Sequence, residues 1–521
     1  MHFRTFAGVL LTLGSLLPPG GQPEASLTAS VERIMGRPEY KHALWGIEFY
    51  DADAGRVLYA INEEKLITPG STTKLLSVGT ALTMLGGSHR FHTRVYRTGD
   101  IGKDGTLRGD VILVASGDPN LSQRMQPDGS LAFENTDHSY SGTAATRAVP
   151  GDPLLVIRQL ADQVAAHGIK RIRGRVLVDA TLFPGYSTLK TGTAVSPICI
   201  NDNVVDLTIG PGAALDAPAT LTVSPANTYM RFVNRVTTAA AGGHEDLDMD
   251  EGVHGADGTL TFTMSGTYPL SQQPFLYDSP IPEPVVFART VFADALHERG
   301  IAIDRKVPST AIDFAAAARQ YTDANLIAEH VSATAAEMAK VILKVSQNTH
   351  ADTLPLLLGA LFGKANGENG YDLERKWLQK EGLDLSGTQQ NDGAGKNAHL
   401  TAAFMVSYLR MMSKRQDFQP FYDALPILGK DGTLFDIQTG SAAAGHVHAK
   451  TGTTYVADPL NRKKLVTGKG LAGYMTTASG KRLILAVYVN NVAVSDGPDE
   501  GAHSVGQVLG EIAAAAYDTV R

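Results

Sequence analysis

A serine and a lysine stand three positions apart in the segment Pro69-Gly70-Ser71-Thr72-Thr73-Lys74. Residues i and i+3 lie on the same side of a helix, so the Lys74 ammonium is expected beside the Ser71 hydroxyl. A serine hydroxyl becomes a good nucleophile when a neighbouring base takes its proton, and a partly desolvated lysine can be that base. An ordinary first helical turn with an exposed lysine has the same spacing, so this pair alone leaves both interpretations open.

The residues after Lys74 are apolar on nearly every side as far as Leu85, and two glycines, Gly86 and Gly87, follow. This pattern predicts a buried helix that stops at the glycines. Burial matters for the chemistry, because the ordinary lysine pKa of about 10.4 is too high for a base near neutral pH. Burial and a second cation nearby would both lower this pKa.

A second candidate group, Ser346-Gln347-Asn348, separates two predicted helices. Apolar residues recur at helical spacing over residues 335–343, and another apolar run covers residues 354–362. Side chains at such a junction can project into a cleft. Alternatively, Asn348 caps the C-terminus of the first helix, which is a common role for asparagine.

A third candidate group, Lys450-Thr451-Gly452, lies in a predicted strand over residues 445–454. Lys450 and Gly452 share a strand face, so a cation stands next to a position without a side chain. The backbone of a substrate could pair with the strand there. His446 and His448 lie on the same face as Lys450, and we interpret them as ordinary surface histidines.

The elements around these groups predict an α/β (α+β) domain in which helices flank an antiparallel sheet. Strands over residues 471–476 and 482–490 follow the strand of Lys450, and a helix over 503–517 closes the chain. A hairpin of residues 44–50 and 56–61 is expected to join the far side of this sheet.

Between residues 93 and 314 the sequence changes to short β-type runs separated by glycine, proline and aspartate turns. These runs predict one or two inserted β-rich domains, so that residues 26–92 and 315–521 form one discontinuous domain. Within the insert, Asp246, Asp248 and Asp250 have the spacing of a calcium loop. The glycine falls one position late and Asp257 replaces the usual glutamate, so a solvated loop is favoured.

Composition narrows the possible classes of protein. The chain has 521 residues, of which 43% are hydrophobic and 19% charged, as in a globular protein of two or three domains. The net charge of −7 argues against nucleic acid as a partner. The single cysteine, Cys199, excludes an internal disulfide and any metal site of several cysteines, and it is expected in the core.

The N-terminus predicts export. Arg4 precedes an apolar run that is broken at Pro18, which is typical of a secretory signal peptide, and we place this segment at residues 1–25. The run is too short to span a membrane comfortably, and no later segment is long and apolar enough to do so. We therefore expect a periplasmic or otherwise extracytoplasmic protein.

The three groups in this order, Ser71-Thr72-Thr73-Lys74, Ser346-Gln347-Asn348 and Lys450-Thr451-Gly452, resemble the signature set of penicillin-recognising serine enzymes. The long separation between the first two groups distinguishes the chain from class A β-lactamases. The chain resembles the D-alanyl-D-alanine carboxypeptidase/endopeptidase family, the class C low-molecular-mass penicillin-binding proteins, over roughly residues 40–515. Further matches include Asn201-Asp202-Asn203 and Asp392-Gly393-Ala394-Gly395.

This resemblance implies a transpeptidase/β-lactamase-like fold and a role for each matching residue. Ser71 would attack the carbonyl carbon between two D-alanines, with Lys74 as the proton acceptor. Ser346 would pass a proton to the leaving amine. The remaining matching residues would bind the substrate: Asn348 its amide, Lys450 and Thr451 its terminal carboxylate, Gly452 its backbone, and the N–H groups of Ser71 and Thr453 the oxyanion.

Three positions bear on substrate preference. The segment at Asp179 and Phe183 resembles the family's pocket for the free end of diaminopimelate, although Asp179 could equally be a turn residue at a strand end. Ala394 stands where the family often has serine, and Thr454 replaces a usual hydrophobic residue.

The implied activity is that of a serine DD-peptidase, either a carboxypeptidase or an endopeptidase, without metal or cofactor. Its expected partners are peptidoglycan stem peptides and β-lactam inhibitors, and peripheral association with the membrane or the wall is left open. Two alternatives stay open: a β-lactamase, and a non-catalytic cell-wall-binding or scaffold protein of the same fold, which Ala394, Thr454 and the large insert would suit.

Overall fold

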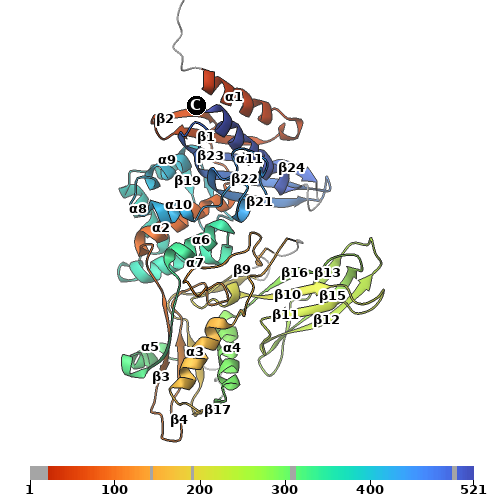
Figure 1. Cartoon of the computed structure of the whole chain (residues 1–521). Helices are drawn as coiled ribbons and strands as arrows, with labels where there is room; N and C mark the ends of the chain where they lie inside the picture. Colours follow the sequence, from red (N-terminus) through yellow and green to blue (C-terminus); the bar gives the residue numbers. More distant parts are fainter. Residues whose placement is uncertain (1–21, 141–144, 189–192, 306–311, 496–500) are drawn as a thin grey trace, which may run out of the picture.

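The computed structural model describes residues 22–140, 145–188, 193–305, 312–495 and 501–521. Its shape is elongated: one end holds the main sheet and its helices, the other holds a smaller mixed body, and a β-rich lobe projects from the side (Figure 1). The predicted signal peptide falls almost entirely outside the described residues. None of the described helices is both long enough and apolar enough to cross a membrane.

The main sheet has the order β2-β1-β23-β22-β21, and the neighbours are antiparallel. The N-terminal hairpin therefore joins the far side of the C-terminal strands, as predicted. The N-terminal part of β22, residues 463–466, also pairs with the short strand β24. The strands are β1 (Leu44–Asp51), β2 (Arg56–Ile61), β21 (Val447–Asp458), β22 (Lys463–Thr476), β23 (Arg482–Asn490) and β24 (Val492–Ser495).

Both faces of this sheet are buried, which explains why β23 is apolar at nearly every position. Leu483, Leu485 and Val487 face a core that includes the terminal helices α1 (Gln22–Met35) and α11 (Ala502–Thr519). Ile484 and Ala486 face the opposite core, which contains the helix after Ser71. A strand covered on both faces loses the polar alternation of a half-exposed strand.

Helices α2, α6, α7, α8, α9 and α10 surround that second core. The Tyr408 hydroxyl donates to the Leu75 carbonyl at 2.8 Å and so ties α9 to α2. The predicted stop after Leu85 is correct, since α2 ends at Gly86, which has a φ of 84°. The bounds are α2 (Lys74–Leu85), α6 (Ala335–Lys344), α7 (Asn348–Leu358), α8 (Gly370–Lys380), α9 (Ala402–Met412) and α10 (Phe418–Asp423).

The inserted part contains a four-stranded sheet in the order β18-β3-β5-β7, covered by two helices. Strand β18 pairs with β3, so residues 326–331, which follow the predicted end of the insert at residue 314, share a sheet with strands of the insert. The insert is also more helical than expected. Its elements here are β3 (His92–Arg97), β5 (Val111–Val114), β7 (Val176–Asp179), β18 (Leu326–Val331), α3 (Leu155–Ala166) and α4 (Pro284–Glu298).

The side lobe is formed by two small sheets, in the orders β11-β10-β16 and β12-β15-β13. Asp246 and Asp248 belong to strand β13, so this part of the acidic segment is not the loop that we expected. Asp250 instead accepts from the N–H groups of Gly252 and Thr263. The strands are β10 (Val204–Gly210), β11 (Thr220–Ser224), β12 (Met230–Ala239), β13 (Asp246–Met249), β15 (Leu260–Pro269) and β16 (Phe275–Pro280).

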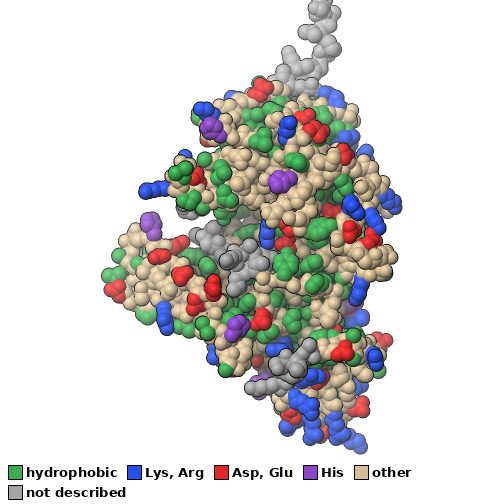
Figure 2. Space-filling model, turned by 180° about the vertical axis from the view of Figure 1, so that it is seen from behind, with side chains coloured by type: hydrophobic (Ala, Val, Ile, Leu, Met, Phe, Trp, Pro, Cys, Tyr) green, Lys and Arg blue, Asp and Glu red, His purple; other side chains and the backbone are tan. Residues whose placement is uncertain are grey.

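Figure 2 shows the face opposite to that of Figure 1. Acidic and basic side chains are interspersed over most of this face, and basic side chains gather at the end remote from the main sheet. On this face, the clearest group of like charges is therefore the basic one at that end.

Candidate active site

Ser71 lies in a 3₁₀ turn, Gly70–Thr73, that runs directly into α2 at Lys74. The turn fits closely against β21: a Cβ atom on Gly70 would lie 2.7 Å from the Thr453 nitrogen. Gly70 also has a φ of 54°, which favours glycine. The turn thus brings the Ser71 backbone against the strand that carries the third candidate group.

The Lys74 side chain is fully buried and reaches three acceptors. Its Nζ lies 2.8 Å from Ser71 Oγ, 2.7 Å from Asn348 Oδ1 and 3.1 Å from the Ala394 carbonyl oxygen. Burial lowers the pKa of Lys74 to about 7, although the nearby Asp352 carboxylate opposes this shift. A lysine in this state is neutral in about half of the molecules at pH 7 and can accept the Ser71 proton across the 2.8 Å contact.

Ser346 occupies the junction between α6 and α7 with a φ of 64°. Gln347 caps the N-terminus of α7, since its side-chain oxygen accepts from the Thr349 N–H at 2.7 Å. The alternative of Asn348 as a C-terminal cap is therefore wrong. Asn348 begins α7, which starts before the predicted residue 354, and its side chain contacts Lys74.

Lys450 is fully buried on β21, and its Nζ donates to Ser346 Oγ and to the Thr451 carbonyl oxygen, each at 2.9 Å. Burial lowers the pKa of Lys450 well below its ordinary value, and the cations of Lys74 and Lys469 lower it further. The structure therefore brings Ser71, Lys74, Ser346, Asn348 and Lys450 into one connected group.

Gly452 contacts protein rather than open space on the face it shares with Lys450. A Cβ atom there would lie 2.0 Å from the Pro69 carbonyl oxygen and 3.1 Å from the Ser71 nitrogen. The Ser71 turn thus occupies the room in which we expected substrate backbone. Gly452 is needed for the fit between this turn and β21.

Gly452→Ala should therefore displace the Ser71 turn and destabilise the protein by about 1–3 kcal/mol, as overpacking usually does. We expect a lower midpoint of thermal unfolding together with slower acylation by a penicillin. Gly440→Ala is the matched control, because a Cβ atom at Gly440 meets nothing within 4 Å. Equal behaviour of the two variants would contradict this account of Gly452.

A cavity of about 800 Å³ opens over Ser71. Its walls include the predicted residues Ser346, Asn348, Thr451 and Thr453, while Lys74, Lys450 and Gly452 lie beneath its surface. Thr454 also lines this cavity.

Asp179 is not among the cavity residues. Its Oδ1 accepts from the N–H and the hydroxyl of Thr181, and its Oδ2 accepts from the Tyr321 hydroxyl at 2.8 Å. Phe183 is buried in a separate apolar cluster. The structure thus fits the alternative of a turn residue at the strand end and does not bring Asp179 to the site.

The Ala394 side chain is buried, and its backbone serves the site. The carbonyl contacts Lys74, and the N–H donates to Asp352 Oδ1 at 2.9 Å and to Asp392 Oδ1 at 3.0 Å. A serine hydroxyl is not required for any of these three contacts, because backbone atoms make them all.

His448 of β21 and His446, which precedes this strand, do not line the cavity. The His448 ring stacks on Tyr422 with centroids 4.4 Å apart, and the His446 ring packs against Tyr517. His446 is exposed and His448 is half-buried, so the interpretation of both as ordinary surface histidines holds for His446 and only in part for His448.

The insert contributes cavity residues that sequence reasoning missed, among them Tyr140 and Asn135. The Tyr140 hydroxyl donates to the Ser346 carbonyl oxygen, and Asn135 Oδ1 accepts from the Gly432 N–H at 2.7 Å. Both are ordinary polar residues of an irregular segment, so the local sequence does not predict that they line the site. The insert therefore forms one wall of the site.

A buried network of charged residues joins the insert to α7. The Arg124 guanidinium donates to Asp137 and Asp202. Burial alone would lower the pKa of His138, but Asp206 and Asp137 raise it well above its ordinary value. His138 is therefore charged, and its ring nitrogens donate to Asp206 and Asp202 at 2.8 Å and 2.6 Å.

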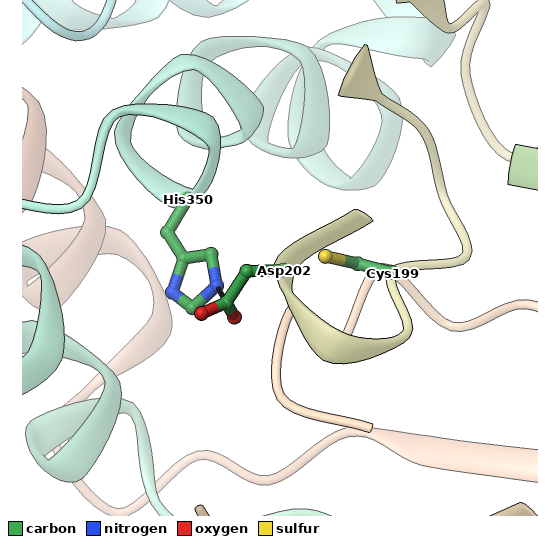
Figure 3. A group of neighbouring side chains, drawn as sticks. All are labelled: Cys199, Asp202 and His350. Atoms are coloured by element: carbon green, nitrogen blue, oxygen red, sulfur yellow. Dashed lines mark hydrogen bonds and ion pairs between the residues drawn. The ribbon is translucent and has the colours of Figure 1, made fainter. Parts of the chain in front are cut away.

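Cys199, Asp202 and His350 bring possible metal ligands within 4.8 Å of one another (Figure 3). The oxygens of Asp202 are already bonded, Oδ1 to His350 Nε2 at 2.8 Å and Oδ2 to Arg124 Nη2 at 2.6 Å. Burial also raises the pKa of the Cys199 thiol well above its ordinary value, which disfavours the thiolate that metals bind. We assign these residues to the charged network and not to a metal site.

Comparisons with known proteins agree with this geometry. A family model described as the D-Ala-D-Ala carboxypeptidase 3 (S13) family matches residues 27–508. The chain is 27% identical over 463 residues to the D-alanyl-D-alanine carboxypeptidase of Actinomadura sp., which covers 84% of this chain and 78% of the relative. It is 22% identical over 459 residues to D-alanyl-D-alanine carboxypeptidase DacB of Haemophilus influenzae, with 85% and 84% covered.

The crystal structure of penicillin binding protein 4 (dacB) from Haemophilus influenzae has the same fold. It matches with a TM-score of 0.67 at 19% identity and covers 95% of this chain and 98% of that chain. A structure of that protein complexed with a novel β-lactam matches with a TM-score of 0.65. The predicted fold class, an antiparallel sheet flanked by helices and interrupted by an insert, is confirmed.

Proposed function

The chain belongs to the D-Ala-D-Ala carboxypeptidase 3 (S13) family and is a serine-type DD-peptidase, and from this premise we propose how its residues act. Ser71 forms an acyl-enzyme with a peptidoglycan stem peptide that ends in two D-alanines. The single observation that carries this assignment is the 2.8 Å contact between Ser71 Oγ and the buried Lys74 Nζ.

In the first step, neutral Lys74 takes the Ser71 proton while Ser71 Oγ attacks the carbonyl carbon. The negative charge on the carbonyl oxygen is held by the N–H groups of Ser71 and Thr453, which lie on facing backbone segments. Removal of one such donor typically costs about 10²–10³-fold in rate.

In the second step, a proton reaches the leaving amine through Ser346, whose hydroxyl accepts from Lys450 at 2.9 Å. The bond to the terminal D-alanine breaks, and an ester remains on Ser71. Asn348 orients Lys74 and binds the substrate amide, while Lys450 and Thr451 attract the terminal carboxylate. Water then hydrolyses the ester. None of these roles needs a metal or a cofactor.

The family acts on the cell wall, so we propose that the protein is exported, with residues 1–25 as the signal peptide, and that it works in the periplasm or another extracytoplasmic space. Both the removal of a terminal D-alanine and the cleavage of a cross-link suit the same acyl-enzyme chemistry. Penicillins are expected to acylate Ser71 in the same way, and the resulting ester is expected to hydrolyse slowly.

The test uses purified full-length protein, a fluorescent penicillin and a pentapeptide that ends in D-Ala-D-Ala. Mass spectrometry of the digested adduct should place the penicillin on the peptide that contains Ser71, and D-alanine should be released from the pentapeptide. Labelling of another residue, or absence of D-alanine, would overturn the assignment. Rapid loss of the adduct would indicate a β-lactamase.

A further inference from the structure

Lys469 is a cation of the cavity wall that the proposed reaction does not use. It lies on β22 directly opposite Thr453, and its Nζ donates to Thr453 Oγ1 at 2.8 Å. The side chain passes α11 at Gly506, where a Cβ atom would lie 3.4 Å from Lys469 Nζ. Lys469 is thus held between strand β21 and helix α11.

An ammonium group can donate three hydrogen bonds. Within the described parts of the chain, the Thr453 hydroxyl is the hydrogen-bond partner of Lys469, so further donors face the cavity. Lys450 differs in this respect, since it is fully buried and bonded to Ser346 and Thr451. Unlike Lys450, Lys469 can therefore form new hydrogen bonds to a bound molecule.

The charges around Lys469 favour an anion. The Lys469 cation is close enough to lower the pKa of Lys450, and Asp436 is the acidic residue that attracts Lys469. His503 also lines this part of the cavity, with its Nδ1 3.9 Å from Asp436 Oδ2. The hydroxyl groups of Thr451 and Thr453 line the same cavity as Lys469 and can donate to an anion there.

We propose that Lys469 and the Thr453 hydroxyl form a subsite for the carboxylate of the leaving D-alanine. Lys469 would then determine specificity for substrates with a free C-terminus, in addition to the role of Lys450. This inference rests on the proposed function, because it concerns the leaving portion of the same substrate. The Thr453 hydroxyl keeps its bond to Lys469 and turns its hydrogen to the carboxylate.

The experiment compares two substrates, a pentapeptide ending in D-Ala-D-Ala and the same peptide with a C-terminal carboxamide. Lys469→Gln should raise KM for the free acid by about tenfold to a hundredfold, because loss of a charge-assisted hydrogen bond usually lowers affinity by this factor. It should leave kcat and the KM of the carboxamide within about threefold of wild type, the scale of a surface substitution. Lys469→Arg keeps the charge and should retain most of the affinity.

Lys463→Gln is the matched control, because Lys463 lies on the same strand but is exposed and remote from the cavity. A second readout is pH. Burial lowers the pKa of Lys469 to about 8 in spite of Asp436, so KM for the free acid should rise above pH 8 in wild type. The carboxamide and the glutamine variant should lack this rise.

Equal losses on both substrates would assign Lys469 a structural role, and no loss on either would also overturn the subsite. Each of these results can occur in a protein that acylates Ser71 and releases D-alanine. Absence of acylation in wild type would instead overturn the proposed function itself.

Discussion

Lys74→Met should slow the acylation of Ser71 by a penicillin by about 10²–10⁴-fold, the usual contribution of general acid–base catalysis. The variant keeps an unbranched side chain of similar length in the buried site but has no atom that can take the Ser71 proton. Stopped-flow measurement with a fluorescent penicillin gives the acylation rate directly.

The pH dependence gives an independent test of the same residue. Because burial lowers the pKa of Lys74 to about 7, its neutral fraction rises through this pH. The acylation rate of wild type should therefore increase between about pH 6 and pH 8 and then level off, following the neutral base. The residual rate of Lys74→Met should lack this increase.

The same pKa makes folding stability depend on pH. Lys74 has a lower pKa in the folded protein than in the unfolded chain, where it is about 10.4. Between these two values the unfolded chain binds more protons, so this residue makes stability rise with pH. The gain falls away as pH drops toward the folded pKa. Lys74→Met should remove this part of the slope in urea unfolding at several pH values.

Lys340→Met is the control for both measurements. Lys340 lies on α6, outside the cavity, and its Nζ contacts Glu337 at 2.7 Å with 30% of its side chain exposed. An exposed pair of this kind contributes little to stability. If Lys74→Met acylates as fast as Lys340→Met, another group must take the Ser71 proton.

The sequence contains enough local information to predict the elements that carry the catalytic group. The apolar runs at 44–50, 56–61 and 482–490 correspond closely to β1, β2 and β23. Ser71 and Lys74 share a turn of chain, so their contact follows from local geometry. Ser346 and Lys450 are predicted through the spacing of three motifs in a known order.

Contacts between distant segments could not be predicted in this way. The orientation of Gly452 follows from strand alternation, but the Ser71 turn that fills the space beside it comes from a distant part of the chain. The sequence around Lys469 does not predict its role, because this role depends on Thr453 of the neighbouring strand and on α11. The position of the Asp179 carboxylate also depends on a distant residue, because the Tyr321 hydroxyl donates to it.

The buried charged network is the strongest example of such long-range information. Asp202 accepts from Arg124 and from His350, which lie 78 and 148 positions away along the chain. Burial alone would lower the pKa of the Arg124 guanidinium, but Asp137 and Asp202 raise it above its usual range. Arg124 thus stays charged in a site that is almost inaccessible to water.

Arg124→Met should therefore destabilise the protein by about 3–5 kcal/mol, since it leaves buried carboxylates without their counter-charge. Urea unfolding measures this loss. Arg231→Met is the control, because Arg231 has 58% of its side chain exposed and pairs with Asp257 at 3.3 Å. Such an exposed pair is worth at most about 1 kcal/mol. Similar losses in the two variants would contradict the importance of the network.

A second substitution separates charge from packing. Asp137→Asn in the Arg124→Met background removes one of the uncompensated carboxylates, so the double variant should recover part of the lost stability. If Arg124→Met is less stable only because methionine packs poorly, the added asparagine should bring no recovery of stability.

His350 stands two positions after Asn348 on α7, and its ring is hydrogen-bonded to Asp202. Loss of the network should therefore also slow acylation of Ser71, because the helix that presents Asn348 to Lys74 loses its attachment to the insert.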